Sequence, residues 1–393
     1  MKNLAVAGLL ALFTISAGHS QTTISAPIII PLEIVTMETD GLPYYKYGIW
    51  ASLGDSETPR LFEFDTGGDG FYAAWGEENS PWWGGPAPRG DAFLQKYGSG
   101  NTYTGYAATT TVSLFASGAA HGTALLTSGE VAVGQSSKIV NGSDTLWDSH
   151  SSPDVPPVQG HFYGDFGLSL KASTNSISNI FTQLNYDTNS VVAGFIVKAA
   201  PYGTTNGATV QVGIRPEQTN DFAFKFKMEG ATDNGGTYSN YSAELIKVAL
   251  ALSSSNSIYS TNKMGINLDT GNPTPGFHTD DIPPDLLSGG GIDPGVLLQL
   301  MQSEGESPFF QLLAGTNYGI DYMYVESKNH PYLNIGAPFF QQYEVMFDFQ
   351  NGWVGINPLV VPEARQAALM GVAVIGFILF AAGRRVYRRL RRN

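Results

Sequence analysis

Two copies of the tripeptide Asp-Thr-Gly constrain the fold of this chain more than any other feature. Asp65 ends the apolar run "RLFEFDTG", and Asp269, 204 residues later (269 − 65), ends "MGINLDTG". Downstream of each copy lies a mostly apolar phrase around a glycine, "YGDFGLSL" with Gly167 and "YLNIGAPFF" with Gly336. A single Asp-Thr-Gly is ordinary turn chemistry, since turns select Asp and Gly. The repeated order of strand, Asp-Thr-Gly and apolar phrase predicts two related halves.

The pairing of these halves would bring two carboxyl groups together. About a pseudo-twofold axis, Asp65 and Asp269 face each other, and two carboxylates that close share one proton. The ionised group can take a proton from water, while the protonated group donates to a substrate carbonyl. We expect four residues to support the pair, the glycines by close backbone approach and the threonines by hydrogen bonds to the opposite half: Thr66, Gly67, Thr270 and Gly271.

The rest of the chain has the composition of a β-rich globular protein. Its 393 residues are 14% charged and 12% aromatic, and none is cysteine. The absence of cysteine excludes a disulfide framework and thiolate metal ligands. Short apolar runs with turn signals about every eight to twelve residues, such as "YYKYGIWASLG" and "TVSLFASG", predict an all-β fold. Short helices are expected in "SNIFTQL" (178–184) and "PGVLLQLMQS" (294–303).

Other site chemistries find no support in the sequence. The six histidines show no metal-ligand spacing such as H-E-x-x-H. The glycine-rich stretch 98–105 lacks the Lys-Ser/Thr of a phosphate loop, and no serine stands in a G-x-S-x-G setting. We therefore expect neither a metal nor a cofactor.

The first twenty residues have the layout of a secretory signal. Lys2 supplies the positive charge, residues 4–15 form the apolar stretch, and Gly18 and Ser20 are the small residues before a cut near Gln21. The apolar stretch is short for a membrane span. This pattern predicts export.

The last residues predict a membrane anchor. Residues 367–383 form an uncharged apolar run long enough for a transmembrane helix. Six arginines follow between Arg384 and Arg392, and the positive-inside rule places them in the cytoplasm. Together with the preceding "VVPEA" (360–364), this end resembles the PEP-CTERM sorting signal of Gram-negative bacteria, although Ala364 stands where the signal has proline. The resemblance implies exosortase-type processing and a chain anchored in the membrane or released to the cell surface or extracellular space.

The charge of the chain excludes nucleic acid as a partner. Removing Lys2 and the seven arginines from Arg365 onward leaves 13 basic residues (21 − 8) against 34 acidic ones, a net charge near −21. Such a body is repelled by nucleic acid and by anionic lipid.

Over residues 45–358 the sequence resembles the pepsin-like aspartic proteases of the bilobal type. "YGSGNTYTGY" (97–106) is similar to the flap hairpin of that family, and "LNIGAPFFQQYEVMFDFQNGWVGINP" (333–358) to its closing segment. The resemblance implies two β lobes with a cleft between them, a catalytic dyad of Asp65 and Asp269, and a peptide or protein substrate. It also implies a monomer, and it assigns flap and substrate-binding roles to Tyr97, Gly98, Ser99 and Gly100.

Both catalytic turns depart from the family pattern. Gly68 and Asp69 follow the first turn, and Asn272 and Pro273 follow the second, where the family usually has hydroxyl residues. Trp75 is the only nearby candidate for the tryptophan that supports the flap tyrosine. Because a hydroxyl at position 68 would favour the charged aspartate, its loss predicts a pH optimum nearer neutral, which Gly68→Ser is expected to reverse.

Two functions stay open at this stage. One is an exported aspartic endopeptidase, and the other is a catalytically weak or inactive pepsin-fold binding or scaffold protein at the cell surface. The expected division of the chain is a signal peptide (1–20), an N-terminal extension (21–43), an N-terminal lobe with the first Asp-Thr-Gly and the flap (44–200), a C-terminal lobe with the second Asp-Thr-Gly (201–359), and a tail with the sorting motif, transmembrane helix and arginines (360–393).

Overall fold

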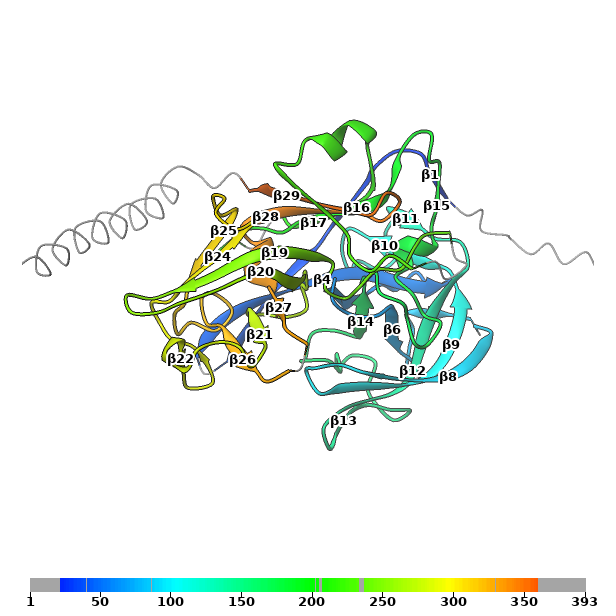
Figure 1. Cartoon of the computed structure of the whole chain (residues 1–393). Helices are drawn as coiled ribbons and strands as arrows, with labels where there is room; N and C mark the ends of the chain where they lie inside the picture. Colours follow the sequence, from blue (N-terminus) through cyan, green and yellow to red (C-terminus); the bar gives the residue numbers. More distant parts are fainter. Residues whose placement is uncertain are drawn as a thin grey trace, which may run out of the picture.

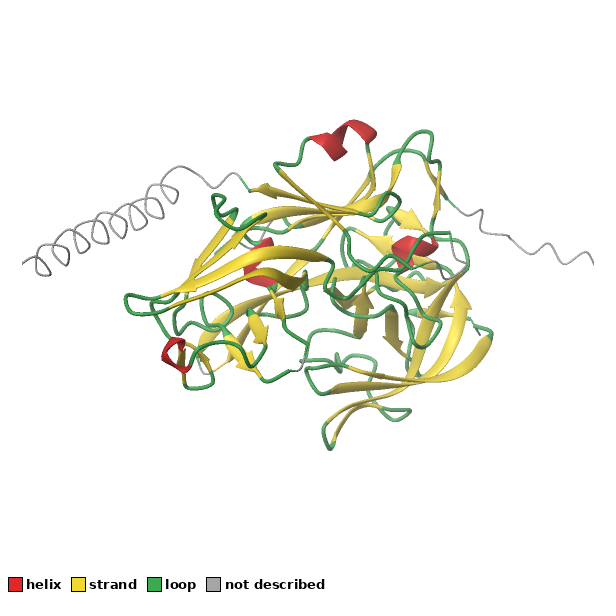
Figure 2. Ribbon diagram, in the orientation of Figure 1, coloured by secondary structure: helices red, strands yellow, loops and turns green. Residues whose placement is uncertain are grey.

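Two large β-sheets and a third sheet that lies beside both make up most of the protein (Figure 1). The computed structural model describes residues 22–359, apart from residues 40, 86, 202, 205–206, 233–236 and 329. Strands dominate this part of the chain (Figure 2), which confirms the all-β expectation. The helical elements are short: η1 (Ile180–Gln183), η2 (Pro216–Asn220), η3 (Pro284–Leu286) and α1 (Ala337–Phe340).

The first-half sheet has twelve strands and contains the first Asp-Thr-Gly. Its strands are β3 (Glu33–Thr39), β4 (Leu42–Gly54), β5 (Arg60–Asp65), β6 (Phe71–Ala74), β7 (Trp83–Gly84), β8 (Arg89–Lys96), β9 (Asn101–Thr110), β10 (Val112–Phe115), β11 (Leu126–Thr127), β12 (Val131–Asn141), β13 (Asp144–Trp147) and β14 (Gly164–Gly167). At its centre, β14 lies between β5, to which it is parallel, and β6, to which it is antiparallel.

The second-half sheet has nine strands. They are β19 (Ile246–Ser253), β20 (Ile258–Asn267), β21 (Gly276–His278), β22 (Leu287–Ser288), β23 (Gly291–Ile292), β24 (Leu297–Met301), β25 (Phe310–Leu313), β26 (Tyr324–Glu326) and β27 (Tyr332–Asn334). Here β27 lies between β20, to which it is parallel, and β21, to which it is antiparallel. The local topology around the two Asp-Thr-Gly turns is therefore the same, as the repeated phrases predict.

The third sheet has six strands and combines distant parts of the chain. It is built from β2 (Ile28–Pro31), β16 (Val192–Lys198), β17 (Thr209–Ile214), β18 (Phe224–Lys227), β28 (Tyr343–Asp348) and β29 (Trp353–Pro358). It lies across the top of the view in Figure 1, next to both halves. A small sheet of β1 (Thr23–Ile24) and β15 (Asn185–Tyr186) completes the fold. One apolar core runs through both halves, so the two lobes are packed as one body.

One sequence expectation is wrong. Residues 294–303, expected to contain a short helix, instead contain strand β24 between β19 and β25. Leu298 and Leu300 are buried while their neighbours are partly exposed, and this two-residue period is that of a strand. The expected turn of helix in 178–184 is present as η1.

The two ends of the chain lie outside the described residues. The predicted signal peptide (1–20) and the predicted transmembrane segment (367–383) both belong to these ends. Among the residues that the structure describes, no helix has the length and apolarity to cross a membrane.

Candidate active site

The first aspartate stands at the end of a buried strand and at the start of a tight turn. Strand β5 ends in Asp65, and Phe62 and Phe64 anchor the strand in the core. The backbone amides of Gly67 and Gly68 donate to Oδ1 of Asp65 at 2.8 and 2.9 Å. Two backbone bonds therefore fix one oxygen of this carboxylate.

The second half repeats this geometry. Asp269 follows β20 and the fully buried Leu268. The amides of Gly271 and Asn272 donate to Oδ1 of Asp269 at 2.8 and 3.1 Å. In both halves the Oδ2 oxygen is left for other contacts.

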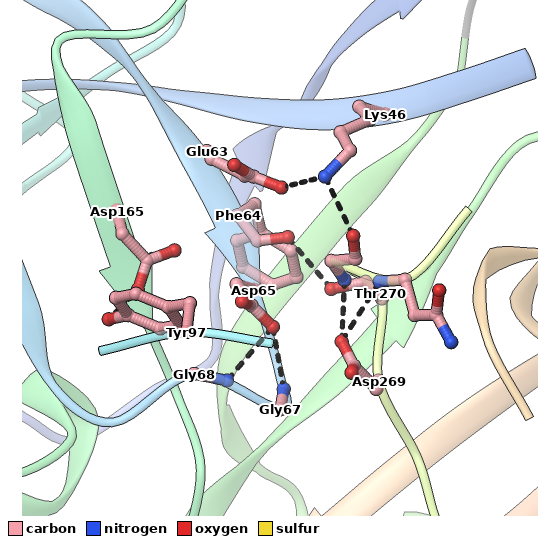
Figure 3. Close-up of polar contacts among 12 residues, drawn as sticks. Lys46, Glu63, Phe64, Asp65, Gly67, Gly68, Tyr97, Asp165, Asp269 and Thr270 are labelled. Carbon is pink, nitrogen blue, oxygen red and sulfur yellow. Dashed lines mark hydrogen bonds and ion pairs between the residues drawn. The ribbon is translucent and has the colours of Figure 1, made fainter. Parts of the chain in front are cut away.

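The two carboxyl groups meet between the turns (Figure 3). The carboxyl groups of Asp65 and Asp269 are close enough for the charge of Asp269 to raise the pKa of Asp65. A Cβ atom at Gly67 would lie 2.4 Å from Cγ of Asp269, and one at Gly271 would lie 2.4 Å from Cγ of Asp65. Because no real side chain can approach so closely, each turn needs glycine to admit the carboxylate of the other half. The structure thus brings the two predicted aspartates together.

The threonines lock the two turns to each other. The Thr66 hydroxyl donates to the carbonyl of Leu268 at 2.7 Å and accepts from the Thr270 amide at 2.9 Å. In the mirror arrangement, the Thr270 hydroxyl donates to the carbonyl of Phe64 at 2.7 Å and accepts from the Thr66 amide at 3.0 Å. Since all these groups are buried, the four bonds fix the spacing of the aspartates across the two halves.

The environment of Asp65 favours its protonated form. Burial, followed by the charge of Asp269, raises the pKa of the Asp65 carboxyl well above its usual range. The charges of Asp165 and Glu63 act in the same direction. Asp65 therefore keeps a proton at a pH where a free aspartate is ionised.

Two further positions around the pair differ between the halves. In β14, Asp165 lies opposite Glu63, two residues before Asp65. In β27, Asn334 lies opposite Asn267, two residues before Asp269. The register therefore makes Asp165 and Asn334 equivalent, and likewise Glu63 and Asn267.

In the second half, the side-chain amide of Asn334 contacts the aspartate directly. Nδ2 of Asn334 donates to Oδ2 of Asp269 at 2.6 Å. An ionised carboxylate is the stronger acceptor for such a bond. This bond holds the Oδ2 oxygen that the backbone amides leave free.

A buried lysine of the first half connects strand β5 to the second turn. Lys46 of β4 forms an ion pair with Glu63, and its Nζ donates to the carbonyl of Gly271 at 2.7 Å. Burial alone would lower the pKa of Lys46, but the charge of Glu63 and its hydrogen bond raise it overall. Lys46 is therefore a charged, buried link to the second turn.

The predicted flap is a hairpin of β8 and β9 whose tip is residues 97–100. Gly98, Ser99 and Gly100 are exposed at this tip. Tyr97 points back toward the aspartates, and its hydroxyl donates to Oδ2 of Asp165 at 2.5 Å. The flap tyrosine is thus held on the first-half side of the site (Figure 3).

Two residues near the first turn have other partners. The ring of Trp75 lies 4.4 Å from the guanidinium carbon of Arg89, so the flap tyrosine finds its partner in Asp165 and not in the expected tryptophan. Asp69 forms an ion pair with Lys171 at 3.0 Å, which makes it a structural acid of the turn. In the described part of the chain, no group of three or more His, Asp or Glu side chains is arranged to hold a metal ion.

Sequence reasoning missed four residues of the site: Lys46, Glu63, Asp165 and Asn334. For Asp165 a signal was available, because it is the one charged residue in the apolar phrase "YGDFGLSL". Lys46 carries no such signal, since a lysine in a strand is most often on the surface.

Comparison with known proteins identifies the fold. No family model matches this sequence, and no curated protein matches it. Among solved structures, the crystal structure of an aspartic proteinase from Irpex lacteus is similar to this chain, with a TM-score of 0.51 at 13% identity. The match covers 85% of this chain and 98% of that protein. The fold is therefore the bilobal β fold of the pepsin-like aspartic proteinases.

Proposed function

We propose that this protein is an aspartic endopeptidase that hydrolyses peptide bonds with a water molecule activated by Asp65 and Asp269. The observation that carries the proposal is the pair itself, two carboxyl groups brought close together on mirrored turns. The reciprocal bonds of Thr66 and Thr270 support it, because they preorganise the pair before substrate binds.

The reaction needs one proton on the pair. The ionised carboxylate takes a proton from water as the water oxygen adds to the peptide carbonyl carbon. The protonated carboxyl gives its proton to the carbonyl oxygen, which produces a tetrahedral diol. Transfer of a proton to the amide nitrogen then allows the C–N bond to break, leaving a new carboxyl end and a new amino end.

The surroundings favour one assignment of these roles. Asp65 is the more buried member, and its neighbours Glu63 and Asp165 are acidic, so it holds the proton. With the proton on Asp65, Asp269 is the member of the pair that activates water, and its Oδ2 is positioned by the bond from Asn334. The substrate lies as an extended strand beside the flap tip, residues 97–100.

A digestion assay tests the proposal. The full-length chain in mild detergent is incubated with an unfolded protein from acid to neutral pH, with and without pepstatin. Asp65→Asn and Asp269→Asn each keep the shape of the side chain but remove the acid–base group, so each lowers kcat/KM by about 10³-fold. Cleavage at close to the wild-type rate by either folded variant contradicts the proposal.

The binding or scaffold function is the other outcome of this assay. The unusual residues after both turns, Gly68 and Asn272 among them, motivate it. A folded wild-type chain that cleaves no substrate under any of these conditions, yet binds pepstatin, would support this second function.

We propose that the protein is exported and held at the membrane by its C-terminal segment until an exosortase-type enzyme processes it. The signal-like residues 1–20 and the tail 360–393 motivate this localisation. Fractionation of cells that express the tagged chain tests it, with a chain ending at residue 359 as the control. Recovery of both chains in the cytoplasm contradicts it.

A further inference from the structure

We propose that Asp165 is a third carboxyl group of this site, a positioning residue whose charge keeps the shared proton on the Asp65–Asp269 pair and extends activity toward neutral pH. The inference rests on the proposed endopeptidase function. It concerns a position where the other half has an amide, Asn334.

Asp165 lies close to the Asp65–Asp269 pair. A Cβ atom at Gly68 would lie 2.7 Å from Oδ2 of Asp165 and 2.8 Å from Oδ2 of Asp65. The two carboxylate oxygens therefore border the same small space, and glycine at position 68 leaves it open. Asp165 is 3% exposed, so water screens this approach poorly.

This geometry also corrects the expectation for Gly68→Ser. A serine at position 68 would meet two carboxylate oxygens at less than 3.0 Å. The room that a hydroxyl side chain would need is taken by Asp165. Gly68→Ser therefore perturbs the site and cannot serve as a clean test of the pH optimum.

Titratable and charged side chains from several elements face Asp165. They come from β4, β5, β6, β9, the flap and the second turn: Lys46, Glu63, Tyr72, Tyr103, Tyr97, Asp65 and Asp269. Lys46 is already paired with Glu63. Among the described residues, Asp65 and Asp165 are thus both buried, and Lys46, the cation that acts on both, already has Glu63 as its partner.

A charge at Asp165 acts on the pair because Asp165 lies close to Asp65. Burial and the charge of Glu63 raise the pKa of Asp165, while the Tyr97 hydrogen bond and Lys46 act in the opposite direction. The charge on an ionised Asp165 therefore opposes loss of the last proton from the pair.

The pH dependence of kcat/KM tests the inference. Asp165→Asn keeps an acceptor for Tyr97 but cannot become charged. The alkaline limb of the profile should move to lower pH by about one unit, because the pair now loses its last proton more easily.

Asp69→Asn is the matched control. Asp69 is also buried and close in sequence, but it pairs with Lys171. Its replacement should leave both limbs in place. An alkaline limb that is unchanged in Asp165→Asn, or that moves equally in Asp69→Asn, overturns the inference.

A second measurement separates this inference from the proposed function. Infrared difference spectroscopy follows the carbonyl band of protonated carboxyl groups between about pH 4 and pH 7. Asp165→Asn should remove part of the titrating band whether or not the chain cleaves a substrate. An unchanged band contradicts the proposed role of Asp165. If the band is lost but the wild-type chain cleaves no substrate, only the proposed endopeptidase function is contradicted.

Discussion

The two halves of the site share a backbone but differ in charge. Around Asp65 the first half places ionisable side chains at two paired positions, Glu63 in the catalytic strand and Asp165 opposite it in the neighbouring strand. Around Asp269 the second half places amides, Asn267 and Asn334, at the equivalent positions. The two halves therefore repeat the geometry of the turn and strands but not the charges around the aspartate.

This difference teaches which features each carboxylate needs. The backbone amides, the glycines and the threonine bonds occur twice, because both aspartates must be fixed and brought close. The charged neighbours occur once, because only one member of a proton-sharing pair has to hold the proton. The asymmetry assigns different roles to two residues with the same motif.

The largest effect on stability is expected from Lys46, which has no equivalent charge pair in the second half. Lys46→Met leaves Glu63 buried without its cation and removes the bond to the Gly271 carbonyl. The free energy of unfolding should fall by about 3 kcal/mol, measured by denaturant titration.

Two variants sharpen this result. Adding Glu63→Gln to Lys46→Met should recover much of the loss, because no uncompensated charge then remains. Lys171→Met removes a lysine whose side chain is 37% exposed, so it should cost about 1 kcal/mol or less. If Lys46→Met and Lys171→Met lower the free energy of unfolding equally, the buried pair of Lys46 and Glu63 does not stabilise the protein more than the partly exposed pair.

An intermediate effect is expected at the two turn glycines, where the halves should behave alike. Gly67→Ala and Gly271→Ala each push a methyl group into the opposite carboxylate, so each should cost about 2 kcal/mol and most of the activity. Thermal unfolding and the digestion assay measure the two effects.

Gly98→Ala in the flap is the control for this pair. A Cβ atom there has no other atom within 4 Å, so stability should be unchanged. A large effect at Gly67 with none at Gly271 would break the equivalence of the turns.

The smallest effect concerns the pH dependence of stability. Asp65 has a pKa raised mainly by burial, so the folded state binds its proton more tightly than the unfolded chain does. This contribution to stability is complete at acid pH and is lost as the pH rises through the folded-state pKa. Asp65→Asn should remove this decrease in stability with rising pH. It should raise the free energy of unfolding at pH 7 by an amount on the order of 1 kcal/mol and leave it unchanged at about pH 3.

Asp269→Asn is the comparison for this measurement. Asp269 is more exposed than Asp65 and accepts an amide bond from Asn334, so its replacement relieves less burial and leaves a donor unpaired. A pH dependence of stability that is the same in the wild type and Asp65→Asn would rule out the inferred environment of Asp65.

The sequence alone determined the repeated plan of the site. Asp-Thr-Gly at the end of an apolar strand is a local pattern, and its second copy with the second apolar phrase was enough to predict that Asp65 and Asp269 meet. The all-β class also follows from local patterns, since two-residue alternation and turn residues can be seen within a few positions. Strand β24 was missed because its apolar run is short and suits either a helix or a strand until neighbouring strands are known.

Only the tertiary structure decided the charges around the pair. Lys46 and Asp165 are 19 and 100 residues from Asp65 in the chain (65 − 46 and 165 − 65), and nothing local to either residue names its partner. The parallel pairing of β14 with β5 places Asp165 opposite Glu63, and the path of β4 takes Lys46 to the Gly271 carbonyl. The position of a side chain across a sheet depends on strand order and register, which local sequence patterns do not contain.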